Sequence, residues 1–328
     1  MVQKLADLQV GMDFELPVLI NQVNVRTAKN GRRFLDLIFS DASQELPGKY
    51  WDASEADVQT FVVGKVVFLT GKCETYQGKL QIKITKMERT ADSQYELNQF
   101  VPHGPLTKTQ LQEQIKALLL EITVPKWNRM VRYLLKQHQS AFYEFPAAKS
   151  NHHDYAGGLA FHTLSIARLA EDVCRHYPQV NKPLLLAGTL LHDLGKTSEL
   201  SGPVGTQYTV KGNLLGHIVI MDAEIVSACA PLKIDPDDED ILLLRHLVVA
   251  HHGLNEYGSP KRPQLLEAEI LHDLDELDAT INMIVKAEKK VQPGQFTERI
   301  FGLDNRRFYV PKRNNSQTAT PKQTNLNL

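Results

Sequence analysis

The chain has 328 residues, which is enough for about two domains of ordinary size. Its 37 Lys and Arg residues nearly balance its 38 Asp and Glu residues, and 42% of the chain is hydrophobic. This composition excludes a disordered or collagen-like protein. We find no uninterrupted apolar run of the length that a membrane span needs, and no apolar signal-peptide segment near the N-terminus. The sequence therefore predicts a folded cytoplasmic protein that contacts no membrane.

Residues 10–90 have the patterns of β-strands. Two β-rich runs flank Lys29–Arg32, whose Asn-Gly pair is a strong hairpin signal, and a second turn is expected at Gln77–Gly78. A short polar helix is expected over residues 54–60, between the third and fourth strands. Five strands with a helix in that position have the order of an OB fold. Residues 1–90 are therefore predicted to form an all-β OB-fold barrel that binds nucleic acid.

The apolar period changes from two to helical spacing after about residue 105. Residues 91–105 contain two prolines and are predicted to form a linker. Residues 106–300 are predicted to be almost entirely helical. Residues 301–328 are basic, and polar without periodicity from about residue 312. The predicted fold class is a multidomain chain with an N-terminal all-β barrel, an all-α helical bundle and a flexible tail.

Seven of the twelve histidines, all within about a hundred residues of the helical part, are candidates for a functional site. A single histidine on an apolar helix face is more often a hydrogen-bonded core residue than a metal ligand. Here, however, the candidate ligands fall in order on separate predicted helices, and Asp193 directly follows one of the histidines. Imidazole and carboxylate groups together suit zinc, manganese, iron, cobalt or nickel, and a shared carboxylate can bridge two ions. The histidines are His152, His153, His162, His192, His217, His251 and His252.

The ordered set resembles the HD-domain metal-dependent phosphohydrolases, through HDLGK at His192–Lys196 and HHDYAGGLAFH at His152–His162. With a barrel ahead of that domain, nearly the whole chain resembles the YhaM-type 3'-5' exoribonucleases of Gram-positive bacteria. The resemblance implies an all-α HD-domain bundle that degrades single-stranded RNA from its 3' end to nucleoside 5'-monophosphates, with single-stranded DNA as a secondary substrate. It also implies two divalent transition-metal ions, Mn²⁺ or Co²⁺.

The resemblance implies a role for each candidate ligand. Asp193 would bridge the two ions, and Asp278 is the alternative to Asp275. For His252, the roles of metal ligand, substrate contact and simple helix-end residue stay open. The implied first site consists of His162, His192, Asp193 and Asp275, and the second of Asp193, His217 and His251.

Two further kinds of residue are expected to act on the phosphodiester. Lys196 is placed to neutralise charge on the phosphoryl oxygens, although it could also pair with the end of a helix dipole. His153 could protonate the departing 3' oxygen as a general acid, and His152 is expected to contact the phosphate. Asp193, Lys196 and His153 are therefore the predicted catalytic residues.

The barrel offers candidate contacts to a single strand. OB folds bind single strands through basic grooves and exposed aromatic rings. Phe34, Phe39 and Phe68 are expected in the barrel core instead. The predicted substrate-binding residues of the barrel are Arg26, Arg32, Arg33, Trp51 and Lys83.

Another function fits the same motifs. An HD enzyme could act on a small nucleotide or cyclic dinucleotide, with the barrel serving assembly. Deleting residues 1–90 would separate the two hypotheses, because a small-molecule enzyme should keep its turnover. The helical surface also leaves room for a homo-oligomer.

Overall fold

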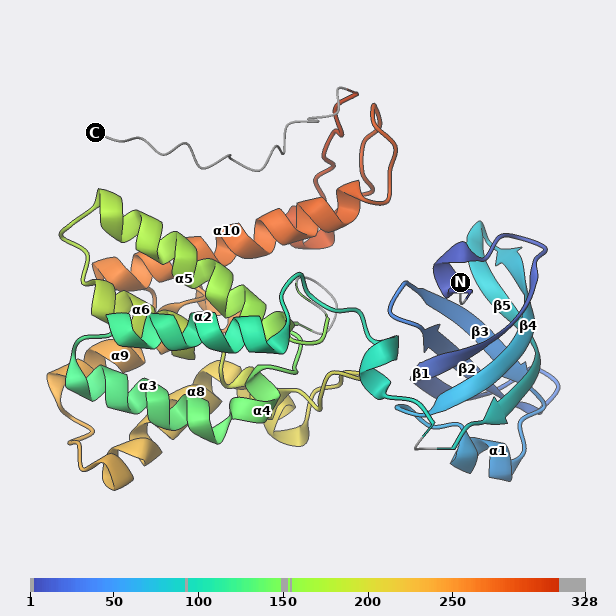
Figure 1. Ribbon diagram of the computed structural model, residues 1–328, viewed down its shortest axis with the longest axis horizontal. Coiled ribbons are helices and arrows are strands. Elements are labelled where there is room, and N and C mark those ends of the chain that lie inside the picture. The colour runs from blue at the N-terminus through green and yellow to red at the C-terminus, as the bar shows by residue number, and fades with distance from the viewer. Residues whose placement is uncertain (1–2, 92–93, 149–152, 154, 313–328) are drawn as a thin grey trace. The chain divides into compact units, whose positions relative to one another are not determined.

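The computed structural model describes residues 3–91, 94–148, 153 and 155–312 (Figure 1). The chain divides into two compact units, Met1–Leu274 and Asp275–Leu328. The boundary between them falls inside helix α10 (Leu266–Glu288).

The N-terminal part is a closed five-stranded barrel (Figure 1). The strands follow the order β1-β2-β3-β5-β4, in which β3 and β5 are parallel and the other neighbours are antiparallel. Helix α1 (Glu55–Thr60) joins β3 to β4. This is the strand order of an OB fold, as the sequence predicted. The strands are β1 (Asp13–Thr27), β2 (Arg33–Ser40), β3 (Glu45–Trp51), β4 (Val66–Tyr76) and β5 (Lys79–Arg89).

The two predicted turns have different geometries. Gln77 and Gly78 both have positive φ, and they form a two-residue turn between β4 and β5. Between β1 and β2, only Gly31 has a positive φ among residues 28–32, so this connection is a longer loop.

Only one of the three phenylalanines assigned to the barrel core is fully buried. Phe39 lies in the core, whereas Phe34 and Phe68 are half-buried. The assignment of Phe34 was wrong. Its ring points to the side of the sheet where Trp51, its cross-strand partner on β3, packs against it.

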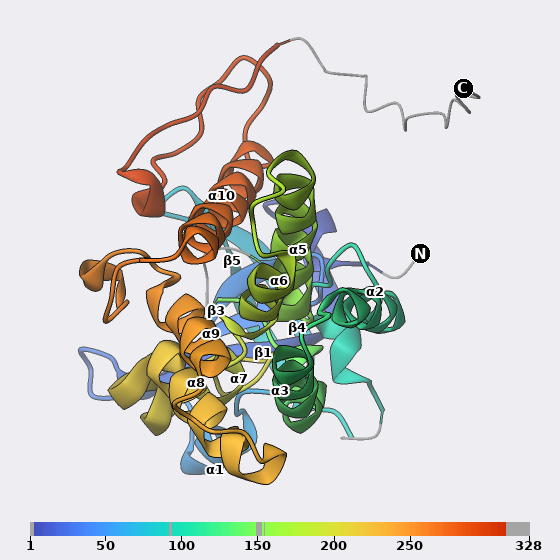
Figure 2. The ribbon, with the colours of Figure 1, turned by 90° about the vertical axis from the view of Figure 1, so that its left-hand side faces the viewer.

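Helices make up most of residues 108–288, and α6 lies at their centre. Residues 184–191 of α6 are all buried, and the helix packs against α3, α5 and α9 (Figure 2). A helix that is apolar on every side must be surrounded in this way. The helices are α2 (Lys108–Glu121), α3 (Pro125–Gln137), α4 (Gln139–Phe142), α5 (Gly158–His176), α6 (Lys182–Leu191), α7 (Lys196–Glu199), α8 (Val210–Leu232), α9 (Glu239–Ala250) and α10, with 3₁₀ turns at Leu5–Asp7, Leu97–Phe100, Asn255–Tyr257 and Phe301–Leu303.

Helix α8 is long and apolar enough to cross a membrane by length and composition. The search for uninterrupted apolar runs missed it because polar residues interrupt the helix. Its backbone is kinked at Gly216, and His217, Met221 and Ile225 are buried. A core helix of a folded domain passes the same test of length and composition, so α8 is weak evidence for a span.

Two segments outside the helices are more ordered than the sequence suggested. The predicted linker contains a 3₁₀ turn, and its Phe100 and Val101 are buried in one apolar cluster with barrel residues Leu19 and Val66. Near the C-terminus, Phe296 pairs with Tyr309 and Ile300 with Arg306 as antiparallel bridges. We call residues 294–310 the C-terminal hairpin. The second unit is therefore not purely helical, and part of the predicted tail has a defined backbone.

Candidate metal centre

The candidate site is built where helix α6 ends. His192 caps the helix, and Asp193 follows it directly. A tight turn then leads into α7, and a Cβ at Gly195 in this turn would overlap the backbone oxygen of His217. Because glycine has no side chain there, the turn can lie directly against α8. The apolar helix α6 thus carries its polar end into the middle of the bundle.

Four imidazoles surround the Asp193 carboxylate, two at each oxygen. The Nε2 atoms of His162 and His192 lie 3.5 and 3.4 Å from Oδ2. Those of His217 and His251 lie 3.4 and 3.8 Å from Oδ1. All five side chains are buried, and Asp193 is only 2% exposed. Each oxygen therefore faces its own pair of imidazoles, and imidazole and carboxylate groups together suit divalent cations.

Backbone carbonyls orient two of the imidazoles. His192 Nδ1 lies 2.8 Å from the carbonyl oxygen of Thr189, and His251 Nδ1 lies 2.7 Å from that of Val248. A carbonyl oxygen can only accept, so each Nδ1 carries the hydrogen and donates it. In the neutral tautomer Nε2 then turns its lone pair toward Asp193, which is how metal-binding histidines are commonly held.

Glu199 on α7 orients His217. Its Oε1 accepts hydrogen bonds from the backbone N–H of His217 at 3.0 Å and from Nδ1 at 3.1 Å. The backbone N–H is available because Gly216 (φ 71°, ψ 156°) interrupts α8 just before it. Burial alone would raise the pKa of Glu199, but the bonds from His217 outweigh it and lower the pKa. The sequence analysis missed Glu199, whose only signal is its place three residues after Lys196.

Lys196 is the nearest cation to the cluster. Its Nζ lies 2.7 Å from Asp193 Oδ2. Burial would raise the pKa of Asp193, yet the charge of Lys196 beside it holds that pKa well below its usual range. Asp193 is therefore a carboxylate at neutral pH.

The donor set fits divalent cations. Asp193 Oδ1 and His217 Nε2 are buried atoms with no hydrogen-bond partner among the described residues. An acceptor oxygen and a ring nitrogen facing each other in the interior are costly unless something positive lies between them. Within the first unit, two overlapping groups have ligand atoms within 4.8 Å of one another: His162, His192 and Asp193, and Asp193, His217, His251 and His252.

The remaining predicted histidines have different surroundings. His252 joins the second group, with its Nδ1 held 2.6 Å from the Tyr257 carbonyl oxygen. His153 is buried, has a left-handed backbone (φ 46°), and its Nδ1 lies 2.8 Å from the Tyr155 hydroxyl. Its ring centre is 5.4 Å from that of His162. His152 lies outside the described residues.

The two aspartates proposed for the first site lie on α10, in the second unit. Asp278 is buried, and Asp275 is half-buried.

On the barrel, the predicted arginines are paired with carboxylates. Arg26 lies 3.1 Å from Asp36, Arg32 lies 3.2 Å from Asp52, and Arg33 lies 2.5 Å from Glu55. These neighbours offset much of the charge that a phosphate would meet. The arginines are therefore weaker candidates for phosphate contacts than their number suggested.

A different barrel surface combines aromatic rings with lysines that form no ion pair with any residue that the structure describes. Trp51 is 56% exposed and packs against Phe34 at 4.7 Å between ring centres. Lys49, which the sequence analysis missed, places its Nζ 5.4–5.9 Å from the rings of Phe34, Trp51 and Tyr76. The strand register sets the predicted Lys83 beside Lys49. We call Phe34, Lys49, Trp51, Tyr76 and Lys83 the barrel face.

Comparison with known proteins defines the class first. Residues 159–280 match the HD domain family model, and the cluster around Asp193 lies within this range. The chain is 44% identical over 312 residues to 3'-5' exoribonuclease YhaM of Listeria welshimeri, which covers 95% of this chain and 99% of that protein. It is 41% identical to 3'-5' exoribonuclease YhaM of Bacillus subtilis, covering 92% of this chain and 96% of that protein. The chain belongs to the YhaM family of 3'-5' exoribonucleases.

Solved structures add little to this assignment. The second OB-fold domain of replication protein A from Methanococcus maripaludis aligns with 29% of this chain and 100% of that one, at 15% identity and a TM-score of 0.23. That TM-score is too low to support a fold assignment, so the OB fold is assigned from the strand order.

Proposed function

We propose that this chain is a metal-dependent 3'-5' exoribonuclease that shortens single-stranded RNA from its 3' end and releases nucleoside 5'-monophosphates. Single-stranded DNA is proposed as a secondary substrate, and the cytoplasm as the place of action. The observation that carries the proposal is the buried Asp193 carboxylate with two imidazole nitrogens at each oxygen. The relatives named 3'-5' exoribonuclease, which match nearly the full length of this chain, support the reaction type.

We assign the cluster two divalent transition-metal ions, with Mn²⁺ as the activating ion and Co²⁺ as a substitute. When bound, such a pair supplies an activated water and stabilises charge during in-line displacement at phosphorus. The carboxylate that completes the first site is proposed to be Asp275, with Asp278 as the alternative, and His252 is available to the second. The proposed ligands are His162, His192, Asp193 and Asp275 in the first site and Asp193, His217 and His251 in the second.

The protein's own groups handle charge and the proton. The Lys196 ammonium, 2.7 Å from Asp193, is close enough to the cluster to neutralise a phosphoryl oxygen of a bound substrate. His153 is proposed to donate the Nε2 proton to the departing 3' oxygen as the P–O3' bond breaks, while its Nδ1 is held by the Tyr155 hydroxyl. Water attacks the phosphorus as that bond breaks, so the phosphate stays on the released mononucleotide. His152 is proposed to contact the same phosphate.

The barrel face is proposed to hold the strand upstream of the cleaved bond. Bases can stack on Trp51 and Tyr76, which are 56% and 55% exposed, while Lys49 and Lys83 lie beside the phosphates. Arg26, Arg32 and Arg33 are proposed to add weaker charge contacts, because each is paired. Such binding does not depend on base sequence.

The decisive experiment uses a 5'-labelled single-stranded RNA with Mn²⁺ and resolves the products by length and by chromatography. We expect a ladder that shortens from the 3' end with 5'-monophosphate release, and no reaction on a 3'-blocked RNA. The His162→Ala variant should lose both activity and bound Mn²⁺, measured by mass spectrometry. His176→Ala is the matched control, because His176 is exposed on the same helix α5. Intact RNA with every divalent metal would refute the proposal and favour a small nucleotide substrate.

A further inference from the structure

The C-terminal hairpin has a well-defined backbone. Val310 donates its N–H to the Gln295 carbonyl at 2.9 Å, and Thr297 donates to the Phe308 carbonyl at 2.8 Å. The buried Thr297 side chain adds a third bond, since its Oγ1 accepts the Phe308 N–H at 3.0 Å. These bonds therefore fix the point at which each side chain leaves the hairpin backbone.

One face of the hairpin carries two aromatic rings and an arginine. The rings of Phe296 and Tyr309 lie 5.2 Å apart, and both side chains are about half exposed. The Arg307 guanidinium lies 5.6 Å from the Phe296 ring, and its Nε donates to the Thr297 carbonyl at 2.9 Å. This bond holds the Arg307 group beside the ring, and its two terminal nitrogens, which make no hydrogen bond to a described residue, can meet an anion.

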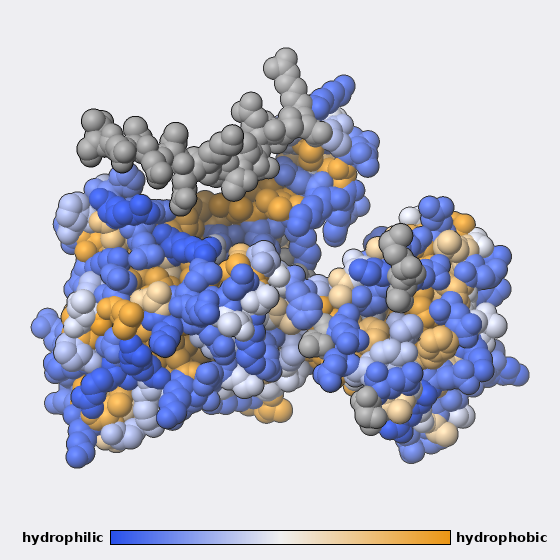
Figure 3. Space-filling model, viewed as in Figure 1, coloured by the Kyte–Doolittle hydropathy of each residue, from blue (hydrophilic) through white to orange (hydrophobic). Residues whose placement is uncertain are grey.

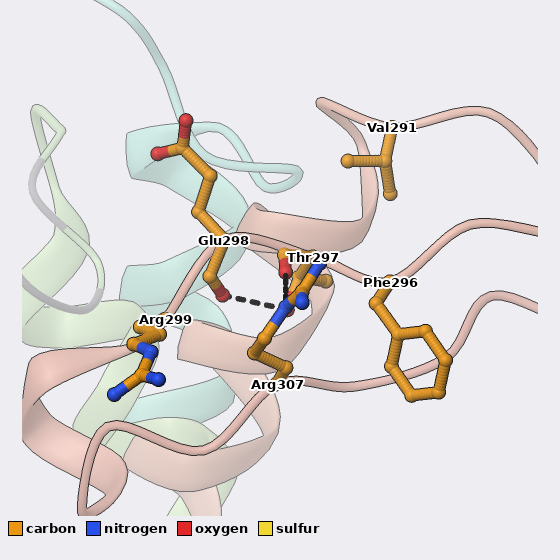
Figure 4. Close-up of a pocket in the computed structure, with 6 residues that line it drawn as sticks. All are labelled: Val291, Phe296, Thr297, Glu298, Arg299 and Arg307. Carbon is orange, nitrogen blue, oxygen red and sulfur yellow. Dashed lines mark hydrogen bonds between the residues drawn. The ribbon is translucent and has the colours of Figure 1, made fainter.

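A pocket of about 320 Å³ opens beside these side chains (Figure 4). Phe296, Arg299 and Arg307 contribute to its wall, and Glu298 also lines it. A phosphate is therefore expected next to the two arginines and away from Glu298. The tip of the hairpin adds Phe301, which is 89% exposed.

The charge of this surface indicates its ligand. Residues 291–312 contain four Lys and Arg residues and two acidic residues. On the face that Figure 3 shows, apolar and hydrophilic side chains are mixed over the hairpin. Exposed rings beside guanidinium groups, with an excess of positive charge, are the combination that stacks bases and pairs with phosphates.

We propose that the C-terminal hairpin is a second binding site for single-stranded RNA, in which Phe296 and Tyr309 stack on bases and Arg299 and Arg307 contact phosphates. The proposal rests on the proposed RNA substrate, and it adds a contact separate from the barrel face. It predicts that long RNA engages the hairpin while a short oligonucleotide does not need it.

The test measures binding of a fluorescent 20-nucleotide oligouridylate to the full chain by anisotropy, in EDTA so that no RNA is degraded. The double substitution Phe296→Ala and Tyr309→Ala should weaken binding about tenfold or more, the effect of losing one or two base stacks. Arg299→Gln should lower the slope of log affinity against log salt by about 0.7, the effect of one lost phosphate contact. Tyr309→Phe keeps the ring and should bind like the unchanged protein. Gln292→Ala, at an exposed residue next to the hairpin, is the matched control.

Three results would overturn the inference. The first is a dissociation constant of the double variant within twofold of the unchanged protein. The second is an unaltered salt slope for Arg299→Gln, a variant that removes no hairpin backbone bond and so keeps the test valid even if the double variant unfolds. The third is a fall in molar mass of the double variant by light scattering with unchanged RNA affinity, which would make the hairpin a contact between copies of the chain.

The failure of this inference and that of the proposed function can be told apart. If the unchanged protein degrades RNA with Mn²⁺ but the hairpin variants bind RNA normally, only the hairpin site is refuted. If the unchanged protein degrades no RNA, the proposed function is refuted, while binding in EDTA still decides the hairpin. The hairpin variants should also cleave a three-nucleotide RNA at the normal rate.

Discussion

Replacing Glu199 by glutamine tests whether this carboxylate holds His217 in position for a metal. The substitution keeps the shape and an acceptor oxygen for both bonds from His217, but it removes the negative charge. Hydrogen bonds to charged groups contribute roughly 1.5–3 kcal/mol, and neutral ones roughly 0.5–1.5 kcal/mol. With two bonds weakened, the loss is about 2 kcal/mol. That energy corresponds to a Mn²⁺ affinity of the second site about 30-fold lower.

The assay is a Mn²⁺ titration read in two ways, as the rate of RNA hydrolysis and as metal bound at equilibrium. We expect Glu199→Gln to need more Mn²⁺ for half-maximal rate and to recover most of its rate at saturation. Glu199→Ala should be worse, because it leaves the buried N–H and Nδ1 groups of His217 without an acceptor. Glu113→Gln is the control, since Glu113 is exposed on α2. Unchanged Mn²⁺ affinity in Glu199→Gln would refute the positioning role.

Four other outcomes are expected. The fold lowers the pKa of Glu199, so Glu199→Gln should reduce the free energy of unfolding by its full amount above pH 4.5, and this difference should disappear as the pH falls through the pKa of Glu199 in the folded protein. A difference independent of pH in urea unfolding of the metal-free protein would contradict this. Gly216→Ala forces alanine into a conformation that costs about 1–3 kcal/mol, and should lower both the melting temperature and Mn²⁺ affinity. Of Asp275→Asn and Asp278→Asn, the one that removes about one equivalent of bound metal identifies the ligand on α10, and no loss in either would exclude both. Trp51→Ala should weaken binding of long RNA about tenfold in EDTA while leaving trinucleotide cleavage unchanged. Equal affinity for long RNA would exclude a role of Trp51 in RNA binding.

The sequence indicated the histidine cluster because the candidate ligands fall on separate helices in the order of the family motif. His192 and Asp193 end a run that is apolar on all sides, which must lie at the centre of a helical domain. His162 lies on α5 and His251 caps α9, and both helices pack against α6, whereas His217 lies on α8, which packs against α7. Residues up to 89 positions apart, from His162 to His251, could therefore be assigned to one place without a structure.

The barrel was harder to interpret because charge pairing depends on strand register. Arg33 and Glu55 are 22 residues apart, and Arg32 and Asp52 are 20 apart, so their contacts are not visible in a run of sequence. The same register sets Lys49 beside Lys83 and Phe34 beside Trp51. Counting basic residues near a hairpin therefore overestimated the arginines and missed the lysine that faces the exposed rings.

The position of Asp193 links the fold to the proposed chemistry. Removing a carboxylate from water costs several kcal/mol unless positive groups surround it, and an apolar residue at the end of α6 would avoid that cost. Lys196 balances one oxygen, but Oδ1 faces the nitrogens of His217 and His251 and has no hydrogen bond among the described residues. Packing alone does not explain such an arrangement. The proposed function explains it, because the same atoms would hold cations beside a phosphodiester.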